Sequence, residues 1–146
     1  MKPCIRICNC LLLAASLVVW ASQFANGADA AQLSGSYHVV RKTDLGPQTG
    51  VQLQLHFTNR GPSELHIQRV TLWDLPHPEK GATQACSVVV HAGASVEVTQ
   101  EFTVPRAEYE LWKRGARPRL VLEIAGPGGR PTNRVVRLDR ISEKGN

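Results

Sequence analysis

The sequence has few side chains that carry chemistry. Met1 is its only methionine, and three of its four cysteines, Cys4, Cys8 and Cys10, lie within the first ten residues, which leaves Cys86 alone. Neither a G-x-S-x-G motif nor an H-E-x-x-H motif is present, and these patterns mark many hydrolases and zinc proteases. We therefore expect a protein that is not an enzyme and that needs no cofactor.

The first thirty residues are typical of a secretory signal peptide. Lys2 and Arg6 precede an apolar run over 11–20, and small residues follow it. Such a run is too short to cross a bilayer permanently, and the small residues suit a signal peptidase. Cleavage is expected after Gly27 or after Ala30, and an uncleaved membrane anchor is the alternative. The sequence thus predicts an extracytoplasmic protein, either periplasmic or secreted.

Cleavage would leave a mildly basic chain with one thiol. Removal of residues 1–30 takes away Lys2, Arg6 and Asp29, so the net charge falls from +5 to +4, and it also removes the three early cysteines. Cys86 then has no partner for an internal disulfide. The remaining length is enough for one domain, whose stability must come from a hydrophobic core.

Seven segments alternate apolar and polar residues with the two-residue period of a half-buried strand. The alternation slips by one position between Ile67 and Val70, which predicts a β-bulge near Gln68-Arg69. In a later segment Gln100 is the one polar residue on the inward face. The expected strands cover residues 37–43, 51–58, 65–72, 87–90, 96–104, 120–124 and 134–138.

A short helix is expected between the fifth and sixth of these strands. Pro105 opens the segment, acidic residues come early, basic residues come late, and Gly115 follows. This order suits the helix dipole and a glycine stop, and it predicts about two turns.

The strand pattern predicts an all-β fold. Strands that alternate in this way hide one face only, as two packed antiparallel sheets require. Seven of them separated by turns predict an immunoglobulin-like two-sheet sandwich with one short helical turn. This domain is expected over residues 31–141, followed by a disordered tail over 142–146.

Two stretches carry a resemblance to a known class of domain. The strand over 51–59 with its Gly61-Pro62 turn, and the run from 92–98 through 102–105, resemble the immunoglobulin-like and fibronectin type III-like domains that bacteria export. The resemblance implies a β-sandwich and a role in binding, spacing or assembly rather than an activity. Antibody-type domains pair two cysteines across the sandwich, and Cys86 has no such partner.

Arginine is concentrated in the last third of the chain, and guanidinium groups bind carboxylate or phosphate with two hydrogen bonds. We therefore expect a non-enzymatic module that binds an extracytoplasmic protein or an anionic cell-envelope polymer. Solvation of sheet faces and protection of sheet edges would explain the same charges. Nucleic acid is not an expected partner, because basic and aromatic residues do not interleave. The candidate binding residues are Arg114, Arg117, Arg119, Arg130 and Arg134.

Two tryptophans offer a second kind of binding site. An exposed indole of Trp73 or Trp112 could stack on a sugar ring, which would make the protein a carbohydrate-binding module. The competing interpretation is that each indole plugs the core, and Trp112 with Leu111 and Ala107 is expected to cap the open end of the sandwich.

Cys86 and His91 suggest a third function, that of a metal-binding carrier. Their C-x4-H spacing resembles part of the copper site of cupredoxins, which hold copper with two histidines and a thiolate. The mature chain has no methionine for the further ligand that such sites normally add. A buried thiol beside a surface histidine is the competing interpretation.

Overall fold

The computed structural model describes residues 32–73 and 82–141. The predicted signal peptide, the predicted tail and the loop over 74–81 lie outside these ranges. The described chain forms seven strands, one α-helix and one 3-10 turn: β1 (Leu33–Leu45), β2 (Gln48–Asn59), β3 (Leu65–Leu72), β4 (Thr83–Val90), β5 (Ser95–Pro105), α2 (Arg106–Lys113), β6 (Arg119–Ala125), η1 (Pro127–Gly129) and β7 (Pro131–Arg140). The all-β class, the seven strands and the single helix agree with the sequence-based prediction.

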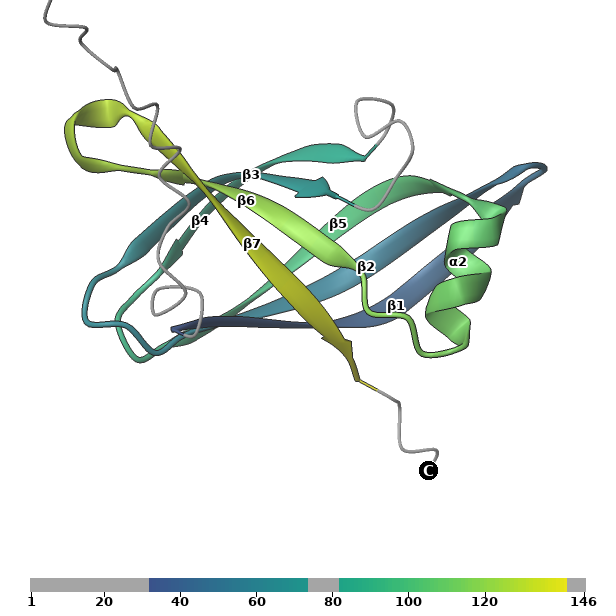
Figure 1. The fold of residues 1–146 in the computed structure, drawn as a ribbon, viewed down its shortest axis with the longest axis horizontal. Coiled ribbons are helices and arrows are strands. Elements are labelled where there is room, and N and C mark those ends of the chain that lie inside the picture. Colours follow the sequence, from purple (N-terminus) through teal and green to yellow (C-terminus); the bar gives the residue numbers. More distant parts are fainter. Residues whose placement is uncertain (1–31, 74–81, 142–146) are drawn as a thin grey trace, which may run out of the picture.

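The strands form one curled, nearly barrel-like sheet in the order β4-β3-β6-β7-β1-β2-β5 (Figure 1). The strands do not separate into the two sheets of the predicted sandwich, because β1 pairs antiparallel with β2 and also parallel with the end of β7. The β1–β7 contact is close at Gly35, where an added Cβ would lie 2.7 Å from Leu138 Cδ2. A glycine at this position lets the two halves of the sheet join.

The core lies on the inner face of this curled sheet. On β2 the residues predicted to face inward are all buried, and Leu53, Leu55 and Phe57 have no exposed surface. Burying such a side chain contributes about 1.5–3 kcal/mol relative to leaving it in water. The period-two pattern therefore orients the strand, because slipping it by one residue would expose the whole row.

Two β-bulges change which side chains of a strand point toward the core. The predicted bulge in β3 is confirmed, since the register shifts between Ile67 and Arg69 against both neighbouring strands. A second shift, between Val39 and Arg41 in β1, was not predicted. It turns Lys42 toward α2, where its Nζ lies 5.2 Å from the centre of the Tyr109 ring.

Helix α2 covers one end of the sheet formed by β1, β2 and β5 (Figure 1). It follows Pro105 and is followed by Gly115, whose φ of +100° is the left-handed conformation that favours glycine. Its eight residues match the two turns predicted, and Tyr109 and Trp112 bury its inner face. Leu111 remains 43% exposed, so it does not share the capping role expected for it.

Candidate functional site

The two edge strands of the sheet, β4 and β5, lie side by side without pairing. They are joined by a tight turn at residues 91–94, in which the Ala94 amide donates to the His91 carbonyl oxygen at 3.1 Å. Among the described residues, β4 forms a ladder only with β3, and β5 forms one only with β2. We call the boundary between β4 and β5 the seam. It is where the curled sheet fails to close.

Gln100 is the polar group that spans the seam. Its side-chain Nε2 donates to the carbonyl oxygen of Ala85 at 3.3 Å. Gln100 and Ala85 are the residues that would face each other if the turn at 91–94 continued as a regular hairpin. A side chain therefore stands in for the backbone hydrogen bonds that a closed sheet would have there.

The inner side of the seam is apolar and partly open. Val88 of β4 and Val96 and Val98 of β5 pack against the core but are only half-buried. The Cys86 thiol is buried beside them at 3% exposure. Burial raises the pKa of this thiol, and a hydrogen bond with Gln100 acts in the opposite direction. A protonated, buried thiol behaves as a small apolar group.

The seam widens at the end away from the 91–94 turn. A cleft of about 340 Å³ there is lined by residues of β1, β2 and β5 and by Gln84 of β4; Arg41 and Glu101 are its charged residues among those described. β4 itself, with the sequence TQACSVVV, has neither charge nor proline. Natural edge strands are usually protected by such residues, so β4 is an unprotected edge.

A network of polar groups holds the closed end of the seam. Asn59, 1% exposed, donates from Nδ2 to the carbonyl oxygens of Ser63 at 2.7 Å and Val90 at 3.1 Å, and its Oδ1 accepts from the Gly61 amide at 2.9 Å. One amide side chain thus links the β2–β3 loop to the end of β4. Sequence analysis did not single out Asn59, because a polar residue at a strand end is common.

On the surface, Glu64 joins the β2–β3 loop to the turn at 91–94. Its Oε1 lies 2.8 Å from His66 Nε2, and its Oε2 lies 3.1 Å from His91 Nδ1. The hydrogen bond with His66, followed by that with His91, lowers the pKa of Glu64 below its ordinary value of 4.5.

This lowered pKa predicts a loss of stability in acid. A carboxyl group whose pKa is lower in the folded state adds stability above its unfolded pKa, and that stability is lost as the pH falls through the folded pKa. We expect Glu64→Gln to be less stable than the wild type at neutral pH. The difference should shrink below pH 4.5, where the wild-type carboxyl becomes protonated. Urea unfolding of both chains between pH 3 and pH 7 would measure it, and a constant difference would contradict it.

The candidate arginines do not gather into one patch. Arg114 donates from Nε to the Glu110 carbonyl oxygen at the end of α2, and Arg117 pairs with Asp139. Arg130 is exposed in the β6–β7 loop. Arg119 and Arg134 lie on different faces of the sheet. The cross-strand partner of Arg119 is Arg137, whereas the cross-strand partner of Arg134 is the buried Leu122.

The two tryptophans differ in how much of each side chain is exposed. Trp112 is 2% exposed, so it is a core residue, as the plug interpretation predicts. Trp73 is 54% exposed, and its backbone amide donates to the Arg119 carbonyl oxygen at 2.9 Å. Its indole is therefore the one of the two that could stack on a ligand.

Cys86 and His91 are not presented together. Cys86 faces the core, whereas the His91 side chain is 73% exposed and pairs with Glu64. Residues 32–73 and 82–141 contain no group of three or more His, Cys, Asp or Glu side chains arranged to hold a metal ion.

Comparison with known proteins adds little to this geometry. No family model and no curated protein matches the chain. A solved structure described as a crystal structure of a protein from Archaeoglobus fulgidus is similar at 13% identity over 72% of this chain and 89% of its own, with a TM-score of 0.38. A similarity this low carries no argument about function. Within the described part of the chain, no helix has the length and apolarity needed to cross a membrane.

Proposed function

We propose that this protein is a non-enzymatic, extracytoplasmic binding module that accepts an extended segment of a partner protein along the seam. The observation that carries the proposal is that β4 and β5 lie side by side yet share no backbone ladder. Peptide groups along these edges match only another peptide backbone, which is how strand-addition modules bind. The extracytoplasmic location rests on the predicted signal peptide, and the kinship with exported immunoglobulin-like domains is likewise a hypothesis.

The side chains at the seam support a peptide rather than a sugar or a metal as the ligand. The half-buried Val88, Val96 and Val98 would receive alternate apolar side chains of an incoming strand. The uncharged sequence of β4 leaves nothing to repel that strand. Gln100 would exchange its bond to Ala85 for one to the partner.

A photocrosslinking residue placed at Ser87, which is exposed on β4, tests this proposal in the native compartment. The control is the same residue at Val135, which is 48% exposed on β7, away from the seam. Crosslinks from Ser87 should converge on one contiguous segment of a partner, and a synthetic peptide of that segment should bind the purified protein. Equal crosslinking from both positions would contradict the proposal.

A matched pair of substitutions gives the second part of the test. Val88→Lys places a charge on the apolar side of the seam and should weaken binding of the identified peptide at least tenfold, whereas Val135→Lys should leave it unchanged. Circular dichroism of both variants would verify the fold. Binding that survives Val88→Lys in a folded protein would overturn the proposal.

One observation favours a second candidate, a carbohydrate-binding or anionic-polymer-binding function. The exposed Trp73 is joined through its backbone amide to the carbonyl oxygen of Arg119 on β6, and Arg119 is paired with Arg137 on β7. A flat indole beside guanidinium groups suits a sugar ring with acidic substituents. Binding of an acidic polysaccharide that is lost in Trp73→Ala would favour this candidate over the seam.

A further inference from the structure

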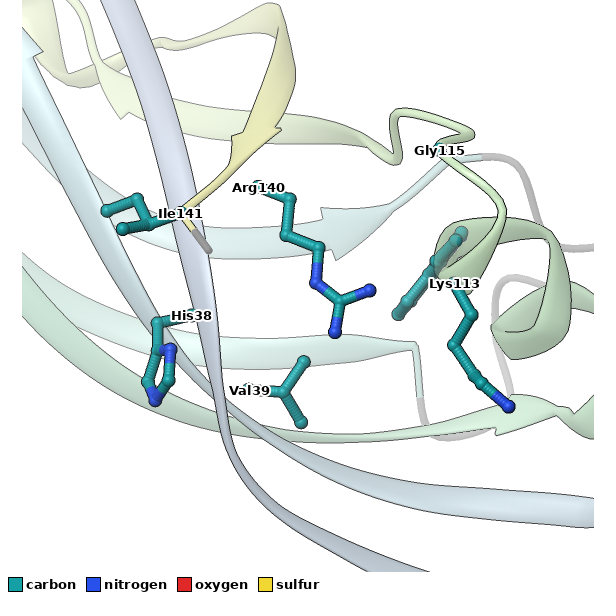
Figure 2. Close-up of a pocket in the computed structure, with 7 residues that line it drawn as sticks. His38, Val39, Lys113, Gly115, Arg140 and Ile141 are labelled. Carbon is teal, nitrogen blue, oxygen red and sulfur yellow. The ribbon is translucent and has the colours of Figure 1, made fainter. Parts of the chain in front are cut away.

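A second cleft lies between α2, β1 and the end of β7. Its volume is about 530 Å³, which is within the range of small-molecule sites. We call it the basic cleft. Figure 2 shows its lining, which consists of His38, Val39, Trp112, Lys113, Gly115, Arg140 and Ile141.

Arg140 is the distinctive residue of the basic cleft. Its guanidinium group reaches into the space between Val39 and Lys113 (Figure 2). Among residues 32–73 and 82–141, no carboxylate lies within 4.0 Å of it. Four other arginines of the described chain do pair with a carboxylate: Arg41, Arg69, Arg106 and Arg117.

The surroundings of Arg140 include a buried tyrosine and a second basic residue. Within the described ranges, the hydroxyl of Tyr37, a residue 1% exposed, has no hydrogen-bond partner. Burial raises the pKa of Tyr37, and the positive charge of Arg140 acts in the opposite direction. Among the described residues of the lining, Lys113 is the other charged residue and is also basic, and none of them is acidic.

Lys113 contributes less than Arg140, because its Nζ already lies 2.9 Å from Glu110 Oε2. Val39 supplies apolar surface on the side that the Arg140 guanidinium enters, whereas the Ile141 side chain points away from that group (Figure 2). The basic cleft thus combines one guanidinium without a carboxylate partner, a second positive charge and apolar contact surface.

We propose that the basic cleft binds an organic anion whose carboxylate or phosphate group is held by the Arg140 guanidinium and whose apolar part packs against Val39. A guanidinium can form two parallel hydrogen bonds with either group. Lys113 would add a point charge at the rim. The site is separate from the seam, so it stands or falls independently of the proposed function.

The test uses phenyl phosphate, benzoate and inorganic phosphate as probes of the full chain, with binding followed by calorimetry and by amide chemical shifts. Phenyl phosphate or benzoate should bind more tightly than inorganic phosphate and should shift Gly115 and Ile141. Arg140→Gln should weaken binding about tenfold or more, because a charge-assisted hydrogen bond is lost. Arg60→Gln, in the exposed β2–β3 loop and outside the lining of the basic cleft, should change it less than twofold.

Two further arms identify the source of the anion. Binding of phenyl phosphate without binding to phosphatidylglycerol vesicles would assign the site to a soluble ligand, and vesicle binding that requires Arg140 but not Arg60 would assign it to a lipid headgroup. Either result supports the site. Equal loss in the two variants, or inorganic phosphate binding as tightly as the organic probes, would overturn it. So would an absence of binding at millimolar concentrations.

Discussion

Replacing Trp112 with alanine is expected to lower the free energy of unfolding by about 3–5 kcal/mol. Trp112 is 2% exposed, and its ring meets Tyr37 and Tyr109 edge-on, with centroid distances of 6.3 and 6.1 Å. Its Nε1 also donates to Glu108 Oε1 at 3.0 Å. The substitution would remove the side chain that holds α2 against the open end of the sheet.

Trp73→Ala is the matched control for this prediction. Because Trp73 is 54% exposed, its loss should change the free energy of unfolding by no more than about 0.5 kcal/mol. Urea unfolding followed by circular dichroism would measure both variants without relying on tryptophan fluorescence. Similar losses in the two variants would contradict the assignment of Trp112 to the core.

Asn59→Asp is expected to lower the free energy of unfolding by about 3 kcal/mol or more. The aspartate keeps an acceptor for the Gly61 amide but loses both donor hydrogens. At neutral pH it would also direct a negative charge at the carbonyl oxygens of Ser63 and Val90, which now accept from Asn59 Nδ2. The β2–β3 loop and the end of β4 would then lose their shared anchor.

The pH dependence of this loss separates charge from shape. Protonation restores one donor, so the destabilisation should decrease in acid, measured relative to the wild type at each pH. Asn133→Asp, on the exposed face of β7, should be nearly neutral at all pH values. A loss for Asn59→Asp that is small, or that is matched by Asn133→Asp, would show that Asn59 does not anchor the loops.

The two β-bulges show which local features could be predicted. In β3 the apolar positions shift from Ile67 to Val70, so the extra residue is visible as a break in the alternation. In β1 the bulge falls between Val39 and Arg41, where the following residues are polar or exposed. No apolar row continues there, so the pattern contains nothing that could reveal the change of face.

The candidate sites also include one residue that the sequence singled out and one that it did not. Gln100 stood out in the sequence as a polar residue on an inward face, and it proves to be the side chain that spans the seam. Arg140 carried no distinguishing signal, because its position in a cleft depends on which segments pack beside the end of β7.

The secondary structure could thus be predicted from the sequence: alternation indicated the strands, Pro105 and Gly115 bounded the helix, and a break in the alternation indicated the β3 bulge. These features depend on neighbours within a few positions, and burial rewards them directly. The closure of the sheet depends instead on contacts between distant segments, such as the approach of β7 to Gly35. So do the burial of one tryptophan and the exposure of the other. Only the tertiary structure could decide these, because many distant pairings satisfy the same alternating pattern, and packing selects among them.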